Sequence, residues 1–107
     1  MKNLIIVRGG GDLATGSIYK LKKSGFRVLI LETADPSAIR RNVAFCEAVY
    51  QGSQTVEDMT CYKAESVQQA QQLLEEEKLV VLVDPQGESI SLLHPMAVVD
   101  GILANRE

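Results

Sequence analysis

The chain has 107 residues, of which 46% are hydrophobic and 23% are charged, and this composition is typical of one globular domain. It excludes a disordered, collagen-like or low-complexity protein, and the length leaves no room for a complete two-domain enzyme. The 11 basic and 14 acidic residues give a net charge of -3, which argues against nonspecific binding to nucleic acid or anionic lipid. We therefore expect a single domain over residues 1–107 that binds neither nucleic acid nor a membrane.

The cysteines and the apolar stretches indicate a cytoplasmic protein. Cys46 and Cys61 have no CxxC motif and no neighbouring histidine, which argues against a zinc site or a disulfide framework. We expect Cys46 to be buried on a helix, whereas Cys61 lies in an ambiguous stretch and could be exposed. The longest apolar runs are far shorter than the ~20 residues of a membrane span, and no secretory signal follows Lys2. The sole histidine, His94, is distant in sequence from both thiols, so we assign no catalytic residue and no metal ligand.

The first third of the chain predicts a strand, a helix and a second strand. Residues 3–7 form a continuous apolar run, which indicates a strand that is buried on both faces of a parallel sheet. Residues 12–24 carry apolar side chains at helical spacing, with Asp12 near the start and Gly25 at the end. Residues 27–31 are again apolar and predict the second strand.

The remainder of the chain continues this alternation of elements. Asp35 followed by Pro36 indicates the start of a second helix, and Ser66 with Gln69 forms a capping-box pattern. The later elements are a helix at 35–47, a short strand at 48–50, an ambiguous stretch at 52–64, a helix at 66–78, and strands at 79–83 and 97–99. We therefore expect an α/β fold, a Rossmann-like three-layer sandwich with a mostly parallel sheet of about five strands and helices on both faces.

Ligands of parallel sheets bind beyond the carboxyl ends of the strands, so the residues at those ends are the first candidates for a site. Four predicted strands end in polar or glycine-containing pairs. These pairs are Arg8-Gly9, Glu32-Thr33, Asp84-Pro85 and Asp100-Gly101.

The strongest local motif is GGGDLA at residues 9–14, a G-x-G-x-x-A pattern between a predicted strand and a predicted helix. Gly9 permits a tight turn, Gly11 lets a pyrophosphate approach the backbone, and Ala14 lets the helix pack closely on the strand. The amides of the helix N-terminus would face the phosphates. Glu32, 23 residues beyond Gly9, can accept hydrogen bonds from a ribose. Alternatively, the glycines only turn the chain and Glu32 is a solvated strand end.

Four further polar residues near this motif have both a binding and a structural interpretation. Asp12 can cap the free helix amides, with a gain of about 1 kcal/mol, but its charge repels a phosphate in the same place. Thr15 can contact a phosphate or serve as a structural hydroxyl. Arg40 and Arg41 have no acidic partner three or four residues away on their helix, which suggests an anion contact, although a solvated helix face explains them at least as well. The candidate cofactor-binding residues are Gly9, Gly10, Gly11, Asp12, Ala14, Thr15, Glu32, Arg40 and Arg41.

Five segments together resemble the YqeB family, whose members are accessory proteins of selenium-dependent molybdenum hydroxylase systems. These segments are RGGGDLATG at 8–16, IRRNVAF at 39–45, EAV at 47–49, TVE at 55–57 and VDGILA at 99–104. The sequence departs from the family pattern at Gly10, where alanine is more usual, and at Asp58, where glycine is more usual. Family members are considerably longer and continue into a second region, so the resemblance implies that residues 1–107 are an N-terminal domain.

The resemblance implies a role in enzyme maturation rather than in turnover. By similarity to the accessory factors of xanthine dehydrogenase, the domain would bind a nucleotide or a nucleotide-bearing molybdenum cofactor, with NAD(P) and a molybdopterin dinucleotide as candidates. Its partners would be a molybdenum hydroxylase or the maturation proteins of that enzyme. Two alternatives remain, an NAD-binding fragment of an oxidoreductase and a nucleotide-sensing regulatory domain. A homodimer formed through the sheet edge near the C-terminus is a further hypothesis.

Overall fold

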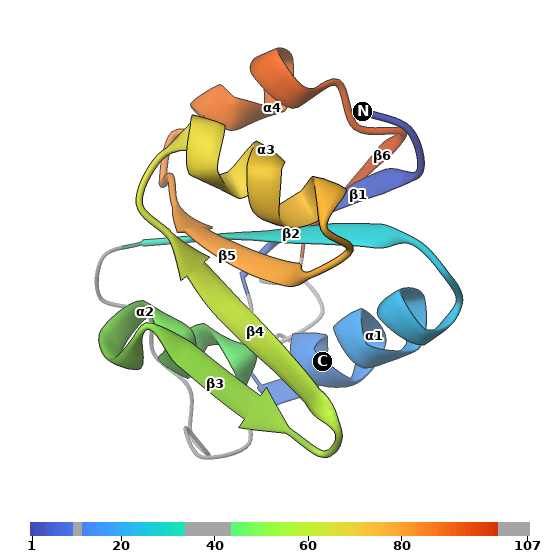
Figure 1. Cartoon of the computed structure of the whole chain (residues 1–107), viewed down its shortest axis with the longest axis vertical. Coiled ribbons are helices and arrows are strands. Elements are labelled where there is room, and N and C mark those ends of the chain that lie inside the picture. The colour runs from blue at the N-terminus through green and yellow to red at the C-terminus, as the bar shows by residue number, and fades with distance from the viewer. Residues whose placement is uncertain (10–11, 34–43, 101–107) are drawn as a thin grey trace.

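The computed structural model describes residues 1–9, 12–33 and 44–100, without the side chains of Asp12 and Leu13. The described elements alternate between strands and helices in an α/β fold (Figure 1). In chain order they are β1 (Leu4–Arg8), α1 (Asp12–Lys23), β2 (Arg27–Glu32), the 3-10 helix η2 (Phe45–Glu47), α2 (Ala48–Gln51), β3 (Ser53–Val56), β4 (Met59–Ala64), α3 (Val67–Glu75), β5 (Leu79–Val83), α4 (Glu88–Leu93) and β6 (Ala97–Asp100). No helix within these ranges is long and apolar enough to cross a membrane.

The strands form one mostly parallel sheet in the order β3-β4-β5-β2-β1-β6. Among the described strands, β3 alone runs antiparallel to its neighbour. The sheet has six strands where about five were expected, because the ambiguous stretch at 52–64 folds into the β3–β4 hairpin. The order differs from the usual 3-2-1-4-5-6 order of dinucleotide-binding folds, since β5 lies between β2 and β4.

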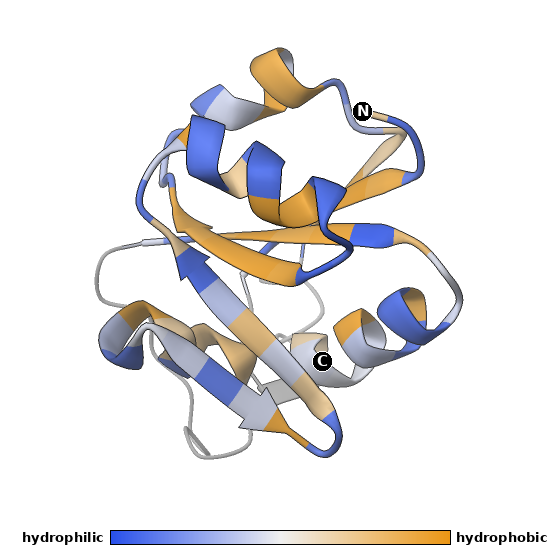
Figure 2. Ribbon diagram, in the orientation of Figure 1, coloured by the Kyte–Doolittle hydropathy of each residue, from blue (hydrophilic) through white to orange (hydrophobic). Residues whose placement is uncertain are grey.

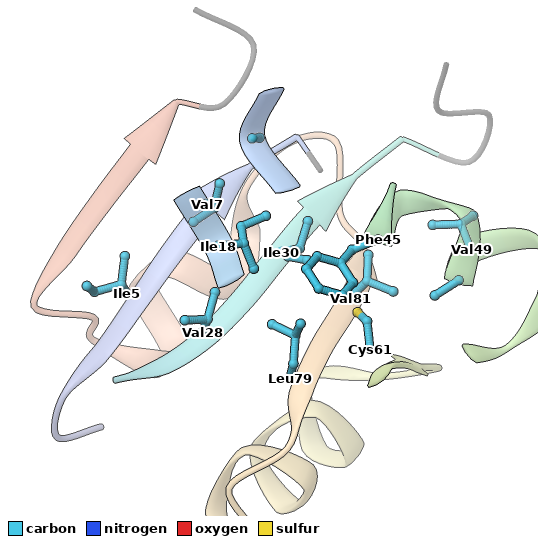
Figure 3. Packing of buried hydrophobic residues seen from close by; sticks show 12 residues of the cluster. Ile5, Val7, Ile18, Val28, Ile30, Phe45, Val49, Cys61, Leu79 and Val81 are labelled. Carbon is cyan, nitrogen blue, oxygen red and sulfur yellow. The ribbon is translucent and has the colours of Figure 1, made fainter. Parts of the chain in front are cut away.

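The apolar strands are buried on both faces of the sheet, which explains why their sequences show no alternation with polar residues. On one face, α1, η2 and α2 cover a cluster that contains Val7, Ile30 and Phe45 (Figure 3). On the other face, α3 and α4 cover a second cluster that contains Ile6 and Leu29. In Figure 2 the central strand β5 is accordingly coloured as hydrophobic along most of its length.

The prediction of a strand at residues 48–50 is wrong, because these residues begin the α2 helix. Ala48 and Val49 are buried in the cluster beneath α1, and short buried apolar runs occur in helices as well as in strands. The helix ends at Gly52, whose φ of 84° is easily adopted by glycine and whose N–H donates to the Ala48 carbonyl at 2.8 Å. Helix α4, a six-residue helix, was not predicted.

The β3–β4 hairpin also corrects the expectation for Cys61, which is fully buried rather than exposed. In the hairpin Cys61 is in register with Leu79 of β5, and both side chains belong to the cluster covered by α1 and α2. Burial, together with the nearby Cys46, raises the pKa of the Cys61 thiol. The thiol therefore behaves as a small apolar side chain.

Asp58, at the tip of this hairpin, ties the hairpin to α1. Its carboxylate accepts hydrogen bonds from the Tyr19 hydroxyl at 2.5 Å and from the Lys23 ammonium at 2.7 Å. The hydrogen bond from Lys23, followed by that from Tyr19, lowers the pKa of Asp58. The aspartate that departs from the YqeB pattern at this turn therefore has a structural role in this chain.

Candidate functional site

The carboxyl ends of the parallel strands lie along one edge of the sheet. Arg8 at the end of β1 is in register with both Leu31 of β2 and Asp100 of β6. Glu32 at the end of β2 is in register with Val83 of β5. The strand-end residues that the sequence singled out are therefore brought together, and this edge contains the candidate site.

Gly9 follows β1 directly and lies at this edge, between β1 and α1. Its φ of 95° lies in the region that glycine adopts without strain, and its N–H donates to the Leu31 carbonyl at 2.8 Å. Helix α1 begins three residues later, at Asp12, so its first amides lie at the same edge. Ala14 is 1% exposed and packs in the core with the strand residues, as expected for a close helix–strand contact.

Thr15 is also buried, but its contact lies within the protein. Its hydroxyl oxygen accepts a hydrogen bond from the backbone N–H of Phe45 at 3.2 Å. The bond joins the first turn of α1 to the start of η2, and the two residues are 30 positions apart in the chain. This contact favours the structural interpretation of Thr15 over the phosphate contact.

Of the remaining predicted site residues, the structure describes Glu32 in full but not the others. Glu32 is half-buried at the end of β2, and its carbonyl accepts a hydrogen bond from the Asp84 N–H at 2.9 Å. Gly10, Gly11, Arg40 and Arg41 lie outside the described residues, as does the side chain of Asp12. Their roles stay predictions.

The helices that follow the parallel strands do not all pack on the same face of the sheet. The helices that follow β1 and β2 in the described chain, α1 and then η2 with α2, pack on one face, whereas α3 and α4, which follow β4 and β5, pack on the other. In parallel sheets such a change of side between neighbouring strands marks the crevice where ligands bind. Here it lies between β2 and β5, where Glu32 adjoins Val83.

Asp84, the first residue after β5, anchors α4 through its side chain. One carboxylate oxygen accepts the Glu88 N–H at 3.0 Å, and the other accepts the Ser89 N–H at 2.8 Å and the Ser89 hydroxyl at 2.6 Å. Partial burial acts to raise the pKa of Asp84, but these hydrogen bonds outweigh it and hold the pKa below its usual value. Asp84 was predicted to be at the site edge, but Ser89 as its partner was not.

We expect Asp84→Asn to lower the free energy of unfolding by about 1 kcal/mol at pH 7, as the loss of a helix cap does. Because the pKa of Asp84 is lower in the folded chain than in the unfolded chain, its stabilisation is complete above the unfolded pKa. That stabilisation is lost as the pH falls through the folded pKa, so the difference between the two proteins should shrink in acid. Urea unfolding at pH 7 and pH 3, with Glu75→Gln as the control, measures this difference. A constant difference between the two pH values would contradict the role of the carboxylate.

A pocket of about 290 Å³ opens beside the same edge, at the carboxyl ends of β4 and β5 and next to α2. It is lined by Val49, Lys63, Ala64, Glu65, Leu82 and Val83. No local pattern in the sequence indicates this pocket, because its residues come from three separate segments and half of them lie in or next to the ambiguous stretch at 52–64. A second pocket of about 330 Å³, lined by residues that include Lys22 and Tyr62, is at the opposite edge and away from Gly9.

The described residues contain no group of three or more His, Cys, Asp or Glu side chains that could hold a metal ion. The fold and the edge define the class of this protein, an α/β domain with a mostly parallel sheet and a pocket at the carboxyl ends of β4 and β5.

The chain is similar to the protein of Escherichia coli (strain K12) named "Uncharacterized protein YqeB", with 42% identity over 103 residues. The similarity covers 96% of this chain and 19% of that protein, and it supports the resemblance to the YqeB family. The chain thus spans about a fifth of the length of this relative. No family model and no solved structure matches the chain.

Proposed function

We propose that this domain binds a nucleotide at the carboxyl edge of the sheet and acts as an accessory module in the maturation of a selenium-dependent molybdenum hydroxylase. The observation that carries the binding proposal is the backbone at Gly9. A left-handed glycine joins a buried parallel strand to a helix that begins three residues later, one strand away from Glu32. Such a junction presents helix amides to an anion without a side chain in the way.

The roles of the residues follow from their order along the edge. Gly9 and Gly11 shape the loop against a diphosphate, Ala14 keeps α1 close to the sheet, and Glu32 accepts hydrogen bonds from ribose hydroxyls. Helices on both faces support a Rossmann-like three-layer arrangement in which β5 lies beside β2. The ligand classes are NAD(P) and a molybdopterin dinucleotide, because both present a pyrophosphate.

The accessory role is supported by the similarity to YqeB together with the YqeB-type motifs of the sequence. The domain would act in the cytoplasm on a molybdenum hydroxylase or with its maturation proteins. Replacing Gly11 by valine in the chromosomal gene should then lower the hydroxylase activity of the cell without lowering the amount of hydroxylase polypeptide. Unchanged activity would remove the accessory role.

Nucleotide binding is tested by calorimetry and thermal unfolding with NAD, NADP, FAD, ATP, CTP and molybdopterin dinucleotide. A ligand at a hundredfold excess over its Kd stabilises the native state by about 2.7 kcal/mol. Gly11→Val should abolish that stabilisation, because its side chain blocks the approach of the phosphates. The matched control is Gly16→Val, since a Cβ at Gly16 meets nothing within 4 Å. If none of these ligands binds the wild type, or if Gly11→Val binds them as tightly as the wild type does, the proposal is refuted.

Glu32→Ala separates the ribose contact from the phosphate contact. We expect it to weaken the ribose-containing ligands about tenfold, as the loss of a hydrogen bond to a charged group does, and to leave inorganic pyrophosphate unaffected. An equal loss for pyrophosphate would place the carboxylate elsewhere in the site.

A further inference from the structure

We infer that the pocket at the ends of β4 and β5 receives the base of the nucleotide, and that it selects a base with an amino group beside a ring-nitrogen acceptor, as in adenine and cytosine. The inference rests on the proposed function, because it takes the diphosphate to lie at the Gly9 turn. It adds the chemical class of the base and the residues that recognise it.

The order of the strands places the parts of a nucleotide in sequence along the edge. From β1 with the Gly9 turn, the next strand is β2 with Glu32, then β5 with Val83, and then β4 with Ala64. Neighbouring strands are about 4.8 Å apart, so the pocket between β5 and β4 lies roughly 10–14 Å from the glycine turn. That interval leaves room for one ribose, positioned at Glu32, between the diphosphate and the base.

The side chains of Glu32, Val83 and Lys63 point to one face of the sheet. Residues in register across parallel strands share a face, so Glu32 lies on the same side as Val83, and Lys63 on the same side as Val81. Val81 belongs to the cluster under α1 and α2, and Val49 of α2 closes the pocket on that side. A ligand that enters from the α1 side can therefore reach Glu32 and the pocket together.

The pocket has the size and the walls for a single aromatic ring system. Its volume of about 290 Å³ is just below the range of about 300 to 1,000 Å³ that is usual for whole-ligand pockets, which suits one part of a ligand. Val49 and Val83 supply apolar side chains on the α2 side, whereas Ala64 and Leu82, which also line the pocket, direct their side chains into the cluster on the other face. Such walls suit the flat faces of a base, whereas the charged parts of a nucleotide are excluded from them.

The polar rim of the pocket carries one donor and one acceptor side by side. The Lys63 ammonium lies 3.8 Å from a carboxylate oxygen of Glu65. The backbone of Glu65 is held at the start of α3, because its N–H donates to the Gln69 side chain at 2.6 Å. The ammonium can donate to a ring nitrogen, and the carboxylate can accept from an amino group. Adenine and cytosine offer this pair, whereas uracil has no amino group.

Titration calorimetry with ADP, CDP and UDP tests the inference on the intact chain. ADP and CDP should bind about tenfold more tightly than UDP, and the tighter of the two identifies the base. Glu65→Ala should remove this preference, whereas Glu75→Ala, the control on an exposed residue of α3, should retain it. Equal affinity of the wild type for all three nucleotides would overturn the inference.

A blocking variant gives a second, independent measurement. Val83→Phe should fill the pocket and weaken ADP at least about tenfold, with inorganic pyrophosphate unchanged. The control Val98→Phe lies on the exposed edge strand β6, and we expect it to bind ADP as the wild type does. If Val83→Phe binds ADP normally while Gly11→Val does not, the base pocket is refuted and the proposed function stands. If no nucleotide or pyrophosphate binds the wild type, both are refuted.

Discussion

Replacing Phe45 by alanine is expected to lower the free energy of unfolding by about 3–5 kcal/mol, the largest effect of any substitution considered for this chain. The ring is fully buried and packs among Ile18, Ile30, Cys61 and other residues of its cluster (Figure 3). Its removal leaves a cavity at the contact between η2 and the sheet. Urea unfolding followed by circular dichroism measures the loss, which is a large fraction of the 5–15 kcal/mol typical of a domain.

Phe45→Leu is the matched control, because it keeps most of the apolar volume. It should cost clearly less than the alanine variant, on the order of 1 kcal/mol. A loss below about 1 kcal/mol for Phe45→Ala would contradict the packing of η2 against the sheet.

The second large effect is expected for Thr15→Val, with a loss of about 1–3 kcal/mol. Valine has nearly the shape of threonine but leaves the N–H of Phe45 without the hydroxyl oxygen that accepts it in a buried position. Thr15→Ser keeps that oxygen and should recover most of the stability. The same unfolding experiment measures both variants.

This prediction also decides between the two interpretations of Thr15. Loss of stability with unchanged nucleotide affinity, measured on the folded fraction, confirms the structural role. Unchanged stability with a lower affinity for pyrophosphate would mean instead that the hydroxyl contacts the ligand.

Much of the fold could be predicted from the sequence because local signals agreed with the tertiary structure. The uninterrupted apolar runs at β1, β2 and β5 are long enough to require burial on both faces, which only a covered parallel sheet provides. Helix α3 begins where the Ser66–Gln69 pattern placed it, with the Gln69 N–H donating to the Ser66 hydroxyl oxygen at 3.1 Å.

The errors fall where local signals were weak. Ala48 and Val49 are apolar residues whose run is too short to distinguish a helix from a strand. The β3–β4 hairpin has a polar outer strand and a turn at Glu57, a non-glycine residue with a φ of 58°, so the usual glycine signal of a tight turn is missing. Helix α4 is held by the contacts of Asp84 with Ser89, which no periodic pattern indicates.

The sequence by itself determined the alternation of buried strands with helices and the positions of Gly9 and Glu32 at strand ends, because these features depend on local composition and spacing. The tertiary structure alone decided that β5 lies between β2 and β4, and that Glu32 therefore adjoins Val83 and the pocket. Strand order depends on which long connections pack together, and the free energy of that packing comes from contacts between residues far apart in the chain.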